Sequence, residues 1–239
     1  MKNFRKPYLS MLIAIIVLFV SCEQYDTPEV ESINKFDYSA FNKFKNSNIF
    51  DVVIEKVKKR ELQKKANSII ERNTNALNII NSELGTNLKM PNLALQLTTT
   101  INSPNEILDL GLENGWIKKG SFDLTKSFIN QLSTEGFEIA ILNYEKETLK
   151  LSLESEEFAK MNIFANTMRS MNYKFPDAFK INRLSKSNSW GCFFASVALV
   201  ATAAGLTSCV TVVACGLAVT LHVMSIANVY DKCIKPALE

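Results

Sequence analysis

The sequence predicts a mainly α-helical protein, with a helical domain followed by a compact apolar C-terminal module of short, disulfide-linked helices. Apolar residues recur at three- and four-residue steps through much of the 239 residues, which include only 8 Gly and 6 Pro. The 41 residues 190–230 then contain no Asp, Glu, Lys or Arg, although 21% of the chain is charged. We expect five segments, with boundaries at 1–21, 22–47, 48–183, 184–190 and 191–239.

The charge is too evenly balanced for a nucleic-acid-binding protein. The formal net charge is +3, and Lys2, Arg5 and Lys6 account for it, because the first 21 residues contain no acid. Nucleic-acid binders normally present a strongly basic face. The chain has a single histidine, His222, which disfavours a histidine-based metal site or triad. We therefore expect no nucleic-acid partner, no metal and no cofactor.

Residues 1–22 have the features of an export signal. Three basic residues precede the apolar run 11–20, which is too short to cross a bilayer because a spanning helix needs about 20 residues. The run ends at Ser21-Cys22. This ending resembles the signal of bacterial lipoproteins, although Phe19 stands where that family usually has Leu. The resemblance implies cleavage before Cys22 and lipidation of Cys22; the alternatives are an ordinary signal peptide or an uncleaved anchor.

A lipidated Cys22 would place the protein in the cell envelope, exported and attached to membrane lipid. Burial of acyl chains contributes about 0.8 kcal/mol per CH₂ group, and stable attachment needs more than one chain. The residues that follow, 22–47, are largely polar and include Pro28. We expect this stretch to be a flexible tether between the anchor and the helical domain.

The helical domain begins with an amphipathic stripe that runs from Asn48 to Leu84 and stops at Gly85. A basic cluster within 56–65 is interleaved with acids, so we interpret it as a solvated helix face and not as a membrane or nucleic-acid patch. The apolar positions of the stripe are Phe50, Val53, Val57, Leu62, Ala66, Ile69, Ile70, Leu77, Ile80 and Leu84.

Three further helical regions follow. Ser103-Pro104-Asn105-Glu106 has the residues of a capped helix start, and Gly111 and Gly115 make that helix short. Regions 123–144 and 152–171 are also helical in pattern, and Gly136 interrupts the first of them. Residues 93–101 are β-prone and predict one short strand or hairpin. The apolar positions expected in the core include Phe128, Leu132, Ile139, Leu142, Phe158, Met161, Phe164, Met168 and Met171.

The helical domain contains no recognisable catalytic constellation. HExxH, CxxC, G-x-S-x-G, EF-hand and phosphate-loop patterns are all absent from the sequence. Glu154, Glu156 and Glu157 are neighbours at a charged helix start, where the helix dipole and solvation account for them. His222 lies between apolar residues, so we expect a buried imidazole. We assign no catalytic residue and expect that the protein is not an enzyme.

Four cysteines frame the uncharged tail: Cys192, Cys209, Cys215 and Cys233. Three arrangements suit it: one transmembrane helix over 208–229, a membrane hairpin turning near Gly205, or a packet of short helices broken near Gly205 and Gly216. In an exported protein these cysteines predict disulfides, with free buried thiols as the alternative. A turn near Gly205 favours Cys192–Cys215, and a second reversal near Gly216 would then permit Cys209–Cys233. We expect this three-segment packet.

The cysteine-framed, uncharged tail resembles the C-terminal peptide of halocin-like bacteriocin precursors. In that group an N-terminal region, which can act in immunity, precedes a toxic peptide with more cysteines than this tail. The polar, basic stretch 183–189 before the tail is suited to cleavage. The sequence thus predicts a non-catalytic lipoprotein whose bacteriocin-like tail attacks a target membrane through 190–230. The alternative is an envelope interaction lipoprotein whose tail is a permanent transmembrane or hairpin anchor.

Overall fold

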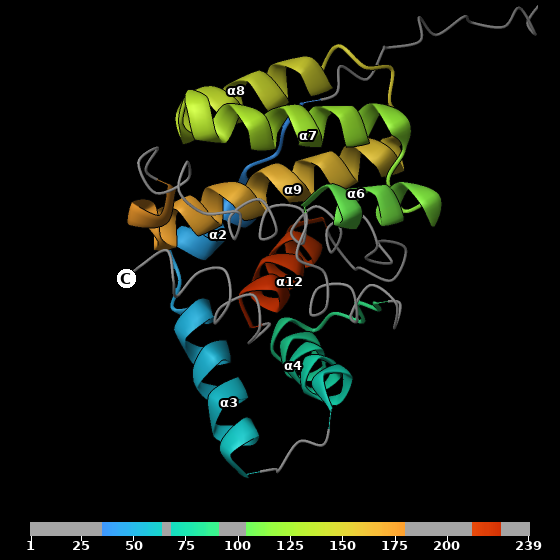
Figure 1. Cartoon of the computed structure of the whole chain (residues 1–239). Helices are drawn as coiled ribbons and strands as arrows, with labels where there is room; N and C mark the ends of the chain where they lie inside the picture. Colours follow the sequence, from blue (N-terminus) through green and yellow to red (C-terminus); the bar gives the residue numbers. More distant parts are fainter. Residues whose placement is uncertain (1–34, 64–67, 91–103, 180–211, 226–239) are drawn as a thin grey trace, which may run out of the picture. The chain divides into compact units, whose positions relative to one another are not determined.

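The computed structural model describes residues 35–63, 68–90, 104–179 and 212–225, and these residues are mainly helical (Figure 1). They form eight α-helices and one 3₁₀ turn and contain no strand, which confirms the mainly α prediction for this part of the chain. The β-prone stretch 93–101 lies outside the described residues. The elements are α2 (Ser39–Lys45), α3 (Ile49–Gln63), α4 (Ile69–Leu84), α6 (Pro104–Glu113), α7 (Lys119–Thr134), α8 (Phe137–Thr148), α9 (Ser155–Lys174), η1 (Pro176–Phe179) and α12 (Val212–Ser225).

The helices from Phe36 onward belong to one compact unit that is arranged in layers around α9. The antiparallel hairpin of α7 and α8 lies on one side of α9, and α12 lies on the other side (Figure 1). The hairpin of α3 and α4 packs beyond α12, and α2 contacts both α9 and α12. Helix α12 therefore joins the two halves of the unit.

Helix α9 is long because its 20 residues contain neither Gly nor Pro, and it ends before Pro176, which cannot continue a helix. Twelve of its residues are buried, more than one apolar stripe would supply. Both sides of α9 are covered, by α7 and α8 on one side and by α12 and α2 on the other. Met161, Met168 and Met171 are at most 1% exposed, so the prediction that they belong to the core is confirmed.

Helix α12 is continuous from Val212 to Ser225, so the predicted break near Gly216 is wrong. A Cβ atom at Gly216 would lie 2.9 Å from the Cβ of Ala40, which is closer than real Cβ contacts. Gly216 therefore serves the close approach of α12 to α2 and not a chain reversal. Gly205, the other predicted turn, lies outside the described residues.

Two of the expected segments, 22–47 and 191–239, contain residues that the structure describes. Helix α2 lies within the stretch 22–47 that we expected to be a tether, because Phe36, Ala40 and Phe44 bury their side chains in the core. In the stretch 191–239, the residues that the structure describes are those of α12. Their described side chains, residues 216–222, are buried and pack into the core of the helical domain.

Three predicted helix boundaries agree with the structure, whereas the ends of the predicted regions 123–144 and 152–171 differ from those of α7, α8 and α9 by three or four residues. Gly85 ends α4 with a φ of 63°, and α6 begins at Pro104. Gly136, with a φ of 84°, separates α7 from α8. Because the helix is interrupted at Gly136, the apolar positions of α8 do not continue the helical pattern of α7. The buried face of α8 therefore comprises Phe137, Ala140, Ile141 and Tyr144, and the prediction that Ile139 and Leu142 are core residues is wrong.

The contact between α12 and α2 predicts an unusual response to Gly216→Ala. In an open helix this substitution stabilises by about 1 kcal/mol. Here we expect a net loss of about 1–2 kcal/mol in the free energy of unfolding, because the new methyl group meets the Ala40 Cβ and overpacks the helix contact. Urea denaturation followed by circular dichroism measures the change.

Two further variants make this test specific. Ala40→Gly removes the opposing methyl group, so the double variant should recover at least about 1 kcal/mol relative to additivity. Gly120→Ala on α7 is the matched control, because the nearest atom to its new methyl is the end of the flexible Leu151 side chain at 3.4 Å. Equal effects of Gly216→Ala and Gly120→Ala would contradict the close approach.

Candidate functional site

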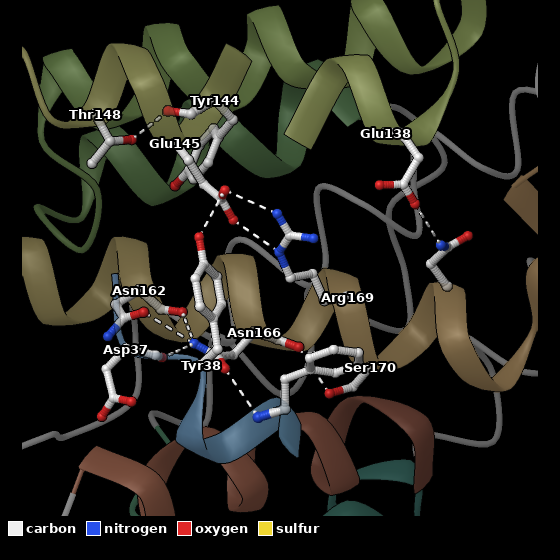
Figure 2. Close-up of polar contacts among 12 residues, drawn as sticks. Asp37, Tyr38, Glu138, Tyr144, Glu145, Thr148, Asn162, Asn166, Arg169 and Ser170 are labelled. Atoms are coloured by element: carbon white, nitrogen blue, oxygen red, sulfur yellow. Dashed lines mark hydrogen bonds and ion pairs between the residues drawn. The ribbon is translucent and has the colours of Figure 1, made fainter. Parts of the chain in front are cut away.

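A polar junction joins the chain before α2 to helices α8 and α9 (Figure 2). Glu145 of α8 accepts two hydrogen bonds from Arg169 of α9, each 2.9 Å long, from Nε to Oε1 and from Nη2 to Oε2. The Tyr38 hydroxyl donates to Glu145 Oε2 over 2.9 Å. This is a bidentate, charge-assisted arrangement, which fixes orientation as well as distance.

The surroundings of this junction keep Tyr38 and Arg169 protonated. The Arg169 guanidinium lies over the Tyr38 ring, 5.1 Å from its centroid. Burial and the hydrogen bond to Glu145 raise the pKa of Tyr38, so the phenol stays protonated and donates. Burial alone would lower the pKa of Arg169, but the hydrogen bond and charge of Glu145 raise it. We interpret the junction as an ionic lock and not as an acid–base pair.

Asn166 of α9 holds the beginning of α2 in place. Its Oδ1 accepts from the backbone N–H of Phe41 over 3.0 Å, and its Nδ2 donates to the backbone carbonyl of Asp37 over 2.7 Å. The N–H groups of a first helical turn have no partner within their own helix. Because no side chain of its own N-cap residue satisfies α2, Asn166 caps this helix from a neighbouring one.

A second polar cluster lies between α7 and α9, and it corrects one prediction. Glu154 and Glu156 have exposed side chains, as expected, but Glu157 is only 1% exposed, so solvation does not account for it. Ser121 Oγ donates to Glu157 Oε1 over 2.5 Å, and Lys160 Nζ lies 3.9 Å from Oε2. The Ser121 hydrogen bond and the charge of Lys160 offset part of the cost of burying the carboxylate, whereas Oε2 accepts no hydrogen bond among the described residues.

The cluster also contains Tyr144, whose hydroxyl lies 2.9 Å from the Met161 sulfur. Burial and the negative charge of Glu157 raise the pKa of Tyr144. A serine beside a carboxylate is a combination that nucleophilic catalysis can use. However, Ser121 is 0% exposed and Glu157 is 1% exposed, so substrate cannot reach them in this conformation. We interpret the cluster as part of the core.

Helix α12 lies in the core, in contact with α9, α4 and α2. Residues 217–222 are all at most 1% exposed, on every side of the helix. Thr220 Oγ1 lies 3.1 Å from Thr167 Oγ1 of α9 and also donates to the Gly216 carbonyl over 2.7 Å. These two hydroxyls set the register between α12 and α9.

His222 lies in α12 and is 0% exposed, which confirms the prediction of a buried imidazole. Burial lowers its pKa to about 4. The imidazole is therefore neutral at physiological pH. This is the protonation state that an apolar core accommodates.

Most of the cysteines assigned from the sequence lie outside the described residues. These are Cys22, the candidate for lipidation, and Cys192, Cys209 and Cys233, candidates for disulfides. Cys215 lies in α12, where its backbone is helical. Among the described residues no three or more His, Cys, Asp or Glu side chains gather as a metal site. In the same part of the chain, no helix is both long and apolar enough to span a bilayer.

The polar junction was not predicted from the sequence. Its α9 members Asn166 and Arg169 are three residues apart, and Asn162, whose carbonyl accepts from Asn166 Nδ2 over 2.9 Å, precedes Asn166 by four residues. Polar residues in phase with a core stripe are a usable signal for a buried polar contact. The partners Tyr38 and Glu145 are 107 residues apart, and no local pattern connects them.

Comparison with known proteins supplies no relative. A scan against protein-family models gave no match, and searches of curated proteins and of solved structures found no significant match either.

The ionic lock predicts that Glu145→Gln destabilises the domain by about 2–4 kcal/mol, because Arg169 would keep its charge in a partly buried site with a neutral partner. Chemical denaturation measures the change. Glu147→Gln on the same helix is the matched control, since its pair with Lys150 is solvent-exposed and should contribute less than about 1 kcal/mol. Equal losses in the two variants would contradict the lock.

Burial of His222 predicts a loss of stability in mild acid. The pKa is about 4 in the folded state and 6.5 in the unfolded state, so between these values the unfolded state binds more protons. The free energy of unfolding should therefore fall by about 3 kcal/mol as the pH falls from about 6.5 to about 4.

Other carboxyl groups also titrate near pH 4, so the test compares the wild type with His222→Gln. The difference in stability between the two proteins, measured by urea denaturation across the pH range, isolates the histidine. We expect this difference to shift in favour of the variant below pH 6.5. A difference that does not depend on pH would show that the imidazole titrates normally in the folded protein.

Proposed function

We propose that this chain is an exported lipoprotein, anchored through Cys22, whose non-catalytic helical domain is an interaction module of the cell envelope. In this proposal the C-terminal segment is a permanent part of the domain. The observation that carries it is the burial of residues 216–222 of α12, on every side of a helix that contacts α9, α4 and α2. The export pattern of residues 1–22 supports the location.

The packing of α4 supports the permanence of the C-terminal segment. Apart from its hairpin partner α3, the main contact of α4 is α12. Removal of α12 would uncover the faces of α4 and α9 that it covers, and would take Leu217, Val219 and Leu221, which are at most 1% exposed, out of the core. Burial of one such side chain contributes about 1.5–3 kcal/mol. Because release of this segment would cost the domain this much folding free energy, we expect the segment to remain part of the domain.

The proposal also includes two disulfides among the four tail cysteines. Export exposes the four tail cysteines to an oxidising compartment, where such cysteines normally pair. We propose Cys192–Cys215 and Cys209–Cys233. Because α12 continues through Gly216, the second pair requires the chain to return after Ser225.

A second candidate function rests on a separate observation. The uncharged stretch 190–230, framed by cysteines and preceded by the basic segment 183–189, resembles a bacteriocin peptide ahead of its cleavage site. In this alternative the helical domain shields α12 until cleavage, and the released tail acts on a target membrane.

Replacement of Cys22 by Ala tests the anchor. We expect the wild-type protein in the membrane fraction, with a mature N-terminus at residue 22 carrying acyl chains, and the variant outside that fraction. Cys233→Ala is the matched control and should remain attached. Retention of Cys22→Ala in the membrane would instead favour the tail as the anchor.

Intact mass measurement of cells and of culture medium, with and without reductant, distinguishes the remaining alternatives. Each disulfide lowers the mass by two hydrogens, so the non-reduced protein reports their number. A fragment in the medium that begins near residue 184 would favour the released peptide. Full-length protein alone, on cells, supports a permanent tail.

A further inference from the structure

Basic and aromatic side chains lie together where α2 meets the end of α9. The Phe41 ring of α2 meets the Tyr173 ring of α9 edge to face, with the two centroids 6.3 Å apart. Lys45 Nζ lies 5.6 Å from the centroid of the Tyr173 ring. Tyr173 is 49% exposed, and Lys43 and Lys45 are also exposed. We call Phe41, Lys43, Lys45 and Tyr173 the α2 patch.

The exposed side of α2 is basic. Between Ser39 and Asn48 the exposed residues include two lysines and no acid. The acids that flank this stretch in the sequence already have partners. Asp37 Oδ1 accepts from the backbone N–H of Ser39 over 2.8 Å, and Asp51 pairs with Lys174 over 2.9 Å. The α2 patch is therefore complementary to an anionic surface.

The α2 patch is also close, along the chain, to the proposed anchor. The chain from Cys22 to Phe36 can span at most about 50 Å. Phe36 is only 5% exposed, and Asn166 holds the beginning of α2 through two backbone groups, so the patch is a fixed part of the domain. A short tether gives the patch a high effective concentration at the membrane surface.

We propose that the α2 patch rests on the membrane to which Cys22 anchors the chain, an inference that depends on the proposed anchor. Lys43 and Lys45 reach the phosphate groups of anionic lipids, and the rings of Phe41 and Tyr173 lie at the level of the headgroups, where aromatic side chains are enriched. The contact turns α2 toward the bilayer. Two lysines strengthen attachment by only about thirtyfold, so the patch orients the domain and does not replace the anchor.

An acidic protein surface is the main competing partner for two lysines. The tether favours lipid, because it keeps a membrane surface within reach of α2 at all times, whereas a separate protein gains no such concentration.

Acetylation of lysines in the anchored protein tests the contact. The mature lipidated protein is placed in vesicles of phosphatidylcholine, alone or mixed with phosphatidylglycerol, and mass spectrometry follows each lysine. We expect Lys43 and Lys45 to react at least about threefold more slowly in the anionic vesicles, because the docked amines are shielded. Lys119 and Lys126 of α7 are the matched internal control, since both are exposed and lie over the Phe122 ring, 4.8 and 5.7 Å from its centroid. Their rates should not change.

A charge reversal tests the same contact without the anchor. In exported Cys22→Ala protein, Lys43→Glu combined with Lys45→Glu should weaken binding to the anionic vesicles at least about tenfold, because two attractive charges become repulsive. Lys119→Glu combined with Lys126→Glu changes the net charge equally and should have little effect. Circular dichroism verifies folding, and if the α2 variant does not fold, the acetylation of the wild type decides.

Three results overturn the proposal. They are equal changes in the acetylation of the two lysine pairs, equal weakening by the two double variants, and protection of Lys43 and Lys45 to the same degree in phosphatidylcholine alone. The last result would favour a protein contact over lipid.

Intact mass separates a failure of the α2 patch from a failure of the anchor. A lipidated protein whose lysines are not protected refutes the patch and leaves the anchor standing. An exported protein without acyl chains that binds anionic vesicles through Lys43 and Lys45 refutes the anchor and leaves the patch standing. Absence of both acyl chains and vesicle binding refutes both.

Discussion

The structure depends on one helix whose described side chains are buried on all sides. Helix α12 is surrounded by α2, α4 and α9, and its described side chains, residues 217–222, are closed off from solvent. A helix in this position cannot carry charge without a partner, because burial of an isolated ion costs many kcal/mol. The uncharged composition of this part of the chain is therefore a requirement of the core. Leu217, Val219 and Leu221 each contribute about 1.5–3 kcal/mol through burial.

Polar contacts then fix how the helices around α12 are aligned. Apolar packing tolerates small slides between helices, whereas a bidentate pair such as Glu145 with Arg169 is satisfied in one alignment only. Asn166 similarly holds the start of α2 through two backbone groups. These contacts position the beginning of the domain relative to α8 and α9.

This alignment matters for a protein that is tethered at its N-terminus. In the proposed lipoprotein, the residues from Cys22 to Phe36 can span at most about 50 Å. The domain is held at α2, so it would remain within this distance of the membrane.

The sequence by itself determined the helical class, the helix ends at Gly85 and Gly136, the start at Pro104, and the core role of the α9 methionines and of His222. Each of these follows from local chemistry: the periodicity of apolar residues, the left-handed backbone that glycine permits, and the missing N–H of proline. The role of the uncharged tail could not be predicted in this way. The same composition suits a membrane span, a released peptide or a buried helix, since all three exclude charge. Only the tertiary structure placed α12 against α9 and α4, buried Glu157 beside Ser121 and left Ile139 and Leu142 in solvent. These outcomes depend on contacts between residues far apart in the chain, and no local pattern records such contacts.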